Sequence, residues 1–319
     1  MDNVCHTLVG AACGAAGLNR RTRFGAATLM ISANIPDVDV LVFASGSPWI
    51  EFRRGWTHGI LAQIVLPVAL TGFVWLFDRF RRARGSEGER AAFASTASAP
   101  RPFHSGWTLL LAFVGVYSHV FLDYLNNYGV RLLAPINWQW FYGDAIFIVD
   151  PWMWFMLAVG IWLAGSRGRP RPARVALGAM SCYIAVMLIS GWAARGIVAE
   201  SWRSAHGTDP RALMVGPIPL WPFSRQVIVD AGDHYEYGTF SWSGPAVTLV
   251  PEKIPKNGDA PQVAAARRDN NIRAFLVWAR FPFWTIEPTP SGTRVTVSDM
   301  RFPGRNGFAA STIVPPLGP

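Results

Sequence analysis

Six apolar runs in the first 194 residues alternate with polar or charged turns. The runs are 4–18, 24–36, 58–78, 107–125, 151–164 and 173–194. A bilayer core of about 30 Å needs about 20 helical residues at a rise of about 1.5 Å each. The runs 58–78, 107–125 and 173–194 reach this length. We expect the three shorter runs to be half-buried, tilted or packed inside a bundle of membrane helices.

The remaining residues, 195–319, have a different pattern. Pro and Gly separate short stretches in which apolar and polar residues alternate, a pattern typical of strands. The clearest stretches are 226–230, 235–242, 273–278 and 294–298. The sequence therefore predicts a mostly α polytopic membrane helix bundle over residues 1–194, followed by a small C-terminal β-rich extramembrane domain over residues 195–319.

The composition agrees with membrane insertion. Hydrophobic residues make up 51% of the 319 residues and charged residues only 15%, as in polytopic membrane proteins rather than in one large soluble core. The formal net charge is +9, which could suggest nucleic-acid binding. Much of the arginine lies in short turns between apolar runs, however, where positive charge reports membrane topology. We therefore expect no nucleic-acid partner.

Arginine is concentrated in three of these turns. Three arginines lie within 20–23, six within 79–101 and four within 165–174. The positive-inside rule places all three turns on the cytoplasmic side of a bacterial inner membrane. The N-terminus and residues 195–319 are then predicted to lie on the outer, periplasmic side. Ser, Ala, Gly and Arg dominate residues 83–101, which are predicted to form a flexible linker.

Ionisable residues at the edges of the apolar runs are the main functional signal. All lie at run ends opposite to the arginine-rich turns: His6, Asp37, Asp39, His58, His119 and Asp123. Ionisable groups beside hydrocarbon are costly, so those that persist usually mark a functional site. The topology rests on arginine alone, yet it puts all six residues on one side. We infer that they converge on a metal centre.

The acidic residues of this set have alternative interpretations. Asp37 and Asp39 follow Pro36, which predicts a helix end, and there they could hold one cation or be solvated in a turn. His119 and Asp123 are four residues apart and share one helix face. They could bind zinc or another divalent metal, or form a hydrogen bond in which Asp123 orients His119.

Two histidines and two arginines lie on the same predicted side. His58 opens the 58–78 run and His6 lies near the start of the first run; each alone could be an interfacial polar residue rather than a ligand. Arg53 and Arg54 depart from the positive-inside pattern. Because a guanidinium pairs bidentately with phosphate, both are candidate substrate-binding residues.

Asp144 and Asp150 flank the apolar segment 145–149. Asp150 precedes Pro151, a pair typical of a helix N-terminus, in which the aspartate caps the first turn. Asp144 has no such explanation. Together with Asp39 it is a candidate catalytic residue that could act as general base.

Several motifs follow one another in a fixed order over residues 1–165. They are His6 before a run of small residues, Pro36-Asp37-Val38-Asp39, Arg54-Gly55-Trp56-Thr57-His58, Ser118-His119-Val120-Phe121-Leu122-Asp123, Asn126-Asn127-Tyr128-Gly129-Val130 and Phe147-Ile148-Val149-Asp150-Pro151. This order resembles the YdjM-like family of membrane-bound proteins, described as metal-dependent hydrolases and distantly similar to zinc-dependent phospholipase C enzymes. The resemblance implies five metal ligands, with Asp39 as the next candidate: His6, Asp37, His58, His119 and Asp123. Arg53 and Gly59 stand where relatives usually have His and Ser.

The leading hypothesis is a membrane-bound, divalent-metal-dependent hydrolase of an ester or phosphoester, acting on a lipid-like substrate at the outer membrane face. One or two metal ions, zinc by expectation, would lower the pKa of a bound water to about 7. A membrane lipid is the expected partner, and the sequence identifies no protein partner. The alternatives are a non-catalytic metal-binding membrane protein and a scaffold with a degenerate site, the latter suggested by Arg53 and Gly59. A transporter is disfavoured, because its ionisable groups should lie near the bilayer midplane.

Overall fold

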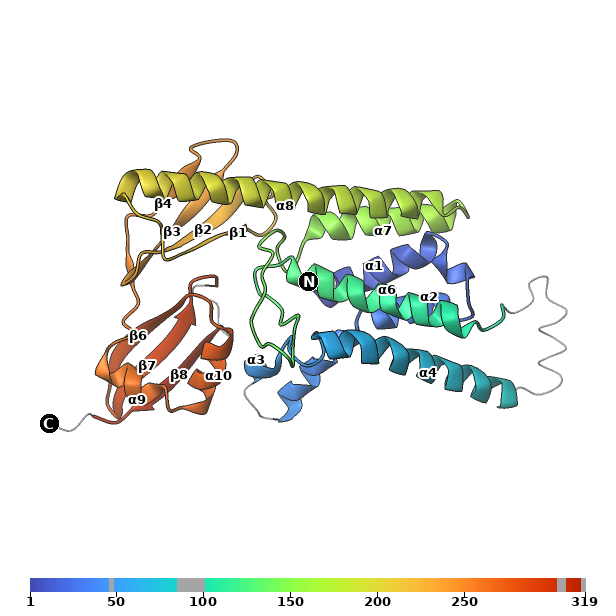
Figure 1. The fold of residues 1–319 in the computed structure, drawn as a ribbon, viewed down its shortest axis with the longest axis horizontal. Coiled ribbons are helices and arrows are strands. Elements are labelled where there is room, and N and C mark those ends of the chain that lie inside the picture. Colours follow the sequence, from blue (N-terminus) through green and yellow to red (C-terminus); the bar gives the residue numbers. More distant parts are fainter. Residues whose placement is uncertain (46–48, 85–100, 303–307, 317–319) are drawn as a thin grey trace. The chain divides into compact units, whose positions relative to one another are not determined.

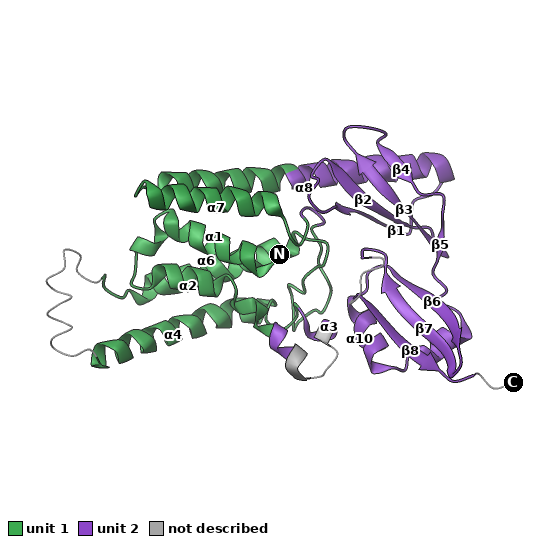
Figure 2. Ribbon diagram, turned by 180° about the vertical axis from the view of Figure 1, so that it is seen from behind, with its two compact units in different colours: residues 1–39, 54–143, 147–186 green, residues 40–53, 144–146, 187–319 purple. Residues whose placement is uncertain are grey.

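The computed structural model describes residues 1–45, 49–84, 101–302 and 308–316 (Figure 1). The chain forms two compact units (Figure 2). Unit 1 comprises Met1–Asp39, Arg54–Gly143 and Phe147–Val186, and unit 2 comprises Val40–Arg53, Asp144–Ile146 and Met187–Pro319. Most of the predicted linker at 83–101 lies outside the described residues.

Unit 1 is helical, as the apolar runs predict. Its elements are α1 (Asn3–Ala15), η1 (Leu18–Arg20), α2 (Gly25–Ser32), the start of η2 (Ile35–Ser45), α4 (Ile60–Arg84), α6 (Ser105–Tyr124), α7 (Pro151–Ser166) and the first part of α8 (Arg171–His206). By length and composition α4, α6 and α8 could each cross a membrane. The pair α2 and η2, bent by 45° at its break, could provide a fourth span.

Two aspartates cap the N-terminal ends of helices in unit 1. The Asp2 side chain accepts a hydrogen bond from the Cys5 N–H and caps α1. The Asp150 side chain accepts from the Trp152 and Met153 N–H groups and caps α7, with Pro151 in the first turn. This confirms the predicted cap at Asp150, because both partners are otherwise unsatisfied donors of a helix start.

The arginine-rich turns of unit 1 lie together at one end (Figure 1). Arg174 donates to the carbonyl oxygen of Ala16, and Arg101 donates to that of Asn19. Arg23 and Arg82 both pair with Asp78 of α4, at 2.9 and 2.6 Å. These contacts join the α1–α2 turn, the end of α4, the start of α6 and the α7–α8 turn, as the topology argument requires.

Small residues let the helices of unit 1 approach closely. A Cβ added at Gly115 of α6 would lie 1.8 Å from the Ser32 Oγ of α2. A Cβ added at Gly10 of α1 would lie 2.7 Å from the carbonyl oxygen of Leu29, also in α2. α2 is therefore held between α1 and α6, and the η2 segment that follows it is fixed beside the C-terminal end of α6.

Unit 2 contains two antiparallel sheets. The first has the order β1-β2-β3-β4, with β5 paired to β3, and the second has the order β6-β7-β8. The strands are β1 (Ala212–Pro217), β2 (Ser224–Asp230), β3 (His234–Ser241), β4 (Val247–Leu249), β5 (Ile254–Pro255), β6 (Pro282–Thr289), β7 (Gly292–Asp299) and β8 (Ala309–Val314). The short helices are α3 (Trp49–Phe52), α9 (Pro261–Ala266) and α10 (Asn270–Trp278).

One face of the first sheet is covered by the second part of α8. Ala194, Val198 and Trp202 of the helix pack against Val215 and Val227 of the sheet. The predicted division after residue 194 thus falls inside α8, which runs without a break to His206. The apolar pattern could not predict that α8 continues, because the apolar run ends near residue 194 and polar residues follow it within the same helix.

The predicted fold class, a helical membrane bundle followed by a β-rich C-terminal region, is confirmed. The strands predicted at 226–230, 235–242 and 294–298 correspond to β2, β3 and β7. The strand predicted at 273–278 is wrong, because these residues lie in α10. Asp269 caps this helix, and its buried side chains Ile272, Phe275 and Trp278 are three residues apart, a helical spacing.

Candidate metal centre

Four buried side chains of unit 1 bring possible metal-binding atoms together. They are Asp37, His58, His119 and Asp123, and one donor atom of each lies within 4.8 Å of the others. Asp37 comes from η2, His58 lies two residues before α4, and the other two lie one turn apart on α6. The cluster is thus at the end of unit 1 opposite to the arginine-rich turns, as the sequence predicts.

The distances within the cluster fit one cation. His58 Nε2 lies 3.1 Å from His119 Nε2 and 3.2 Å from Asp123 Oδ2. His119 Nε2 lies 3.5 Å from Asp123 Oδ2, and Asp37 Oδ1 lies 3.9 Å from each imidazole Nε2. Tetrahedral zinc with ligands at about 2.0–2.1 Å separates them from one another by about 3.3 Å. Small side-chain movements would therefore bring all four donors around one ion.

Hydrogen bonds orient both imidazoles toward the cluster. His119 Nδ1 lies 2.7 Å from the carbonyl oxygen of Ala33. Because a carbonyl only accepts, Nδ1 carries the proton, and the lone pair of Nε2 faces the other donors. His58 Nδ1 lies 2.9 Å from Thr57 Oγ1, which in turn lies 3.3 Å from Asp39 Oδ2. Metal-bound histidines typically have such partners on the second ring nitrogen.

Asp39 therefore lies behind His58 and outside the four-donor group. Its Oδ2 accepts the backbone N–H of Arg54 at 2.7 Å and approaches His58 Nδ1 at 3.8 Å. The carboxylate can fix the entry into α4 and the orientation of the imidazole. In this position Asp39 acts on a metal through Thr57 and His58.

The burial of the cluster favours a bound cation. Two carboxylates and two imidazoles that face one another away from water are costly unless positive charge compensates them. Arg54 and the Met1 ammonium supply positive charge at Asp123, and a bound cation would supply it to all four donors. Burial lowers the pKa of His58, and burial together with the neighbouring His119 lowers the pKa of His6 to about 3. Both rings are therefore neutral at pH 7, which is the form that binds metal.

His6 lies on the other side of Asp123. Its ring stacks on His119 with centroids 3.8 Å apart, and its Nε2 lies 3.4 Å from Asp123 Oδ1. Neither ring nitrogen of His6 has a hydrogen-bond partner within the described part of the chain. The N-terminal ammonium of Met1 also contacts Asp123 Oδ1. Asp123 thus presents Oδ2 to the four-donor group and Oδ1 to His6 and the Met1 ammonium.

Arg54 is buried beside the cluster. Its Nε lies 3.0 Å from Asp123 Oδ2, and its Nη1 donates to Asn126 Oδ1 at 3.1 Å and to the carbonyl oxygen of Gly129 at 3.3 Å. The guanidinium also lies over the ring of Tyr128, 4.6 Å from its centroid. Arg54 can therefore hold Asp123 in place as well as contribute positive charge to an anion site.

Asn126 is a polar residue of this site to which sequence reasoning assigned no role. Its Oδ1 accepts from Arg54 and from the backbone N–H groups of Tyr128 and Gly129. These three donors fix the orientation of the amide. Its Nδ2 is then a buried donor without a hydrogen-bond partner in the described residues. Only the family motif marked this position, because its geometry depends on the turn that follows α6.

Two sequence-predicted residues belong to unit 2. Both carboxylate oxygens of Asp144 contact Arg280 Nη1, at 2.9 and 3.0 Å, and its carbonyl oxygen accepts from Arg225. Arg53 is half-buried and precedes Arg54. The structure does not bring either residue into the four-donor group, and the roles predicted for them, in catalysis and in substrate binding, stay predictions.

Comparisons with known proteins cover the part of the chain that contains the cluster. Residues 1–194 match the family model described as YdjM inner membrane protein. An uncharacterised protein of Bacillus subtilis (strain 168), YfhP, is 25% identical over 292 residues, which cover 89% of this chain and 79% of that protein. No solved structure matches the chain. All four donors lie within the residues that the family model matches.

Proposed function

Because the chain belongs to the YdjM inner membrane protein family, we propose that its buried Asp/His/His/Asp cluster is the metal centre of a membrane-bound hydrolase. The proposed reaction is cleavage of an ester or phosphoester bond. The observation that carries the proposal is the set of four buried donors, within 4.8 Å of one another, on three different segments of unit 1. The proposed metal is zinc, since two imidazoles and two carboxylates suit it.

The residues around the metal position have separable roles. A bound zinc ion would lower the pKa of a water molecule to about 7 and polarise the scissile group. Ala33 and Thr57 hold the two imidazoles, and Arg54 holds Asp123. Arg54, with Arg53, is proposed to bind substrate phosphate, while Asp39 and Asp144 remain the candidates for a general base.

Asn126 is proposed to act with Arg54 on the substrate anion. Its oriented Nδ2 is buried and has no hydrogen-bond partner among the described residues, and a buried donor is costly until it finds an acceptor. The Asn126 Oδ1 atom lies 3.1 Å from the Arg54 guanidinium. A phosphate oxygen that reaches Arg54 is therefore a suitable acceptor for this amide.

A lipid-like substrate is proposed because of the aromatic residues at the same end of unit 1. Trp56, two residues before His58, packs edge-on against Trp138 with ring centroids 5.1 Å apart. Trp56 is 58% exposed, and the neighbouring Ile136 is 80% exposed. Tryptophan is enriched at membrane–water interfaces, so these side chains would place the metal centre at headgroup depth. The proposed orientation puts this end, and unit 2, on the periplasmic side.

One observation favours a non-catalytic metal-binding protein or scaffold as the second candidate. A Cβ added at Gly59 would lie 2.2 Å from the carbonyl oxygen of Ala134. The loop around Ala134 thus occupies the space of the serine that relatives usually have here. If that serine contributes to catalysis, this chain would retain the metal site without the reaction.

Elemental analysis and turnover separate these candidates. The full chain is purified in detergent as wild type, His58→Ala, His119→Ala and, as control, the exposed His104→Ala at the opposite end of α6. We expect about one zinc per chain in wild type and control, and loss of zinc in both cluster variants. Full occupancy in both cluster variants would reject the site. Zinc binding without turnover of any phosphodiester or phospholipid in a broad panel would favour the second candidate.

A further inference from the structure

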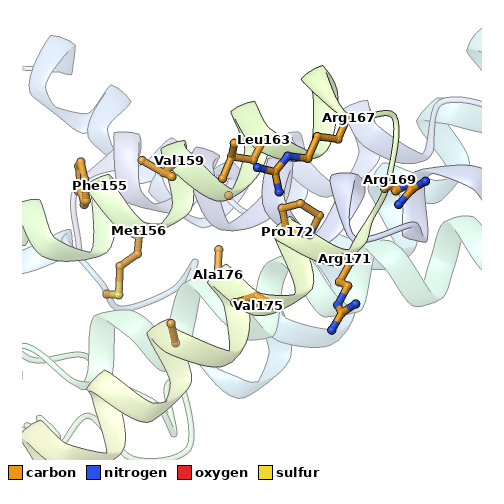
Figure 3. A pocket seen from close by; sticks show the side chains of 12 residues that line it. Phe155, Met156, Val159, Leu163, Arg167, Arg169, Arg171, Pro172, Val175 and Ala176 are labelled. Carbon is orange, nitrogen blue, oxygen red and sulfur yellow. The ribbon is translucent and has the colours of Figure 1, made fainter.

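A groove lies between α7 and the start of α8, at the arginine-rich end of unit 1 (Figure 3). It has a volume of about 590 Å³. Its lining residues all belong to residues 155–179, far along the helices from the metal cluster. The groove is therefore independent of the proposed hydrolase site.

The floor of the groove is apolar. A Cβ added at Gly160 would lie 2.2 Å from the Cβ of Ala176, so α7 and α8 nearly touch there. Larger side chains stand on both sides of this contact, including Phe155, Leu163 and Val175. Phe155 is 67% exposed and Val175 is 63% exposed. In a bilayer these surfaces face hydrocarbon, so the groove has the apolar character that an acyl chain requires.

The mouth of the groove is cationic. Arg167, Arg169 and Arg171 line it, and all three are exposed. No residue between 151 and 194 is acidic. Among the described residues, no carboxylate pairs with any of these three guanidiniums. Arg174 differs, because its side chain is bound to the carbonyl oxygen of Ala16. Three uncompensated guanidiniums at the end of an apolar groove are complementary to a phosphate attached to an acyl chain.

We propose that this groove binds an anionic phospholipid of the leaflet at the arginine-rich end. The headgroup phosphate would contact Arg167, Arg169 and Arg171, and one acyl chain would lie over Gly160 and Ala176. A zwitterionic lipid would bring its own positive charge to the same arginines and bind less tightly. Basic pockets between membrane helices recognise anionic headgroups in this way.

Lipid binding to the full chain in detergent tests this proposal. Native mass spectrometry would titrate phosphatidylglycerol and phosphatidylcholine against the wild type and two triple variants. The test variant carries Arg167→Gln, Arg169→Gln and Arg171→Gln. The control variant carries Arg79→Gln, Arg81→Gln and Arg84→Gln at the end of α4, and so loses the same charge at the same end without altering the groove.

We expect the wild type and the control to prefer phosphatidylglycerol, and the test variant to bind it at least about tenfold more weakly, since each arginine near the surface contributes about fivefold. Ala179→Phe, which adds a ring in the apolar groove and keeps all arginines, should also weaken lipid binding. Equal losses in the two triple variants would overturn the proposal, and so would the absence of a preference for the anionic lipid. It would also be overturned if inorganic phosphate competes with the lipid and Ala179→Phe weakens neither the competition nor the lipid binding, because the site would then recognise phosphate alone. Melting temperatures of all variants exclude loss of the fold.

Discussion

The Asp39→Asn substitution tests whether Asp39 is a ligand, a general base or a positioning residue. In the structure its carboxylate accepts hydrogen bonds from the Arg54 N–H at 2.7 Å and the Thr57 hydroxyl at 3.3 Å. It approaches His58 at Nδ1, 3.8 Å away, whereas the metal-facing nitrogen of that ring is Nε2. Asp39 should therefore act on a metal only through His58.

The expected effect follows from this indirect position. Asparagine keeps the shape and one acceptor oxygen for the Arg54 N–H, but removes the negative charge behind His58. Loss of such a partner typically lowers metal affinity by about 10–100-fold, or about 1.4–2.8 kcal/mol of binding free energy. Asp37→Asn is the matched comparison, because Asp37 Oδ1 lies 3.9 Å from both Nε2 atoms. We expect the Asp37 variant to lose far more affinity.

Zinc titration in competition with a chelator of known affinity measures both variants. Equal, near-complete loss in the two variants would show that Asp39 is itself a ligand and that the positioning argument is wrong. No loss at Asp39 would refute the argument as well. If saturating zinc restores binding but not hydrolysis, Asp39 is the general base that the sequence suggested, and its place behind His58 does not describe its role.

Further outcomes are expected from other features. His6→Ala should keep the zinc ion held by the four-donor group, so elemental analysis should still find about one zinc per chain; loss of that ion would make His6 one of its ligands. Burial would raise the pKa of Asp299, but the charge of Arg301 and hydrogen bonds from Arg301 and Phe281 hold that pKa below its ordinary value. The stabilisation is then present above about pH 4 and lost as the pH falls through the folded-state pKa, so Asp299→Asn should flatten the fall of the melting temperature between pH 6 and pH 3. Alkaline phosphatase fused after residue 316 should be active if unit 2 is periplasmic; inactivity would reverse the proposed orientation.

Length and charge patterns predicted much of unit 1. Three apolar runs were long enough to span a bilayer, and they correspond to α4, α6 and α8. The arginine turns predicted one common end, and the contacts of Arg23, Arg101 and Arg174 join that end in the structure. Run-edge residues then predicted the cluster, because a bundle of antiparallel helices brings alternate run ends to the same level.

The rest depends on contacts that no local pattern encodes. Asp144 pairs with Arg280, which is 136 residues away in the sequence. Asn126 obtains its orientation from a turn whose backbone donors are set only after folding. The stretch 273–278 by itself indicates a strand. The residues nevertheless form a helix, whose N-terminus is capped by Asp269. In each case a specific tertiary or capping contact decides between conformations that the local sequence permits.

The unbroken helix α8 has a consequence for how the chain can vary. One stripe of buried side chains runs along its whole length: Ala173, Ala176, Met180, Ile184, Met187, Ala194, Val198 and Trp202. The first part of this stripe packs in unit 1 and the last part covers the first sheet of unit 2. Since each helical residue turns by about 100°, buried side chains recur every three or four residues in both parts, and one helix contributes to two separate cores. A charged side chain in place of Met180 should therefore destabilise unit 1, and one in place of Val198 should destabilise unit 2, although both lie on the same unbroken helix.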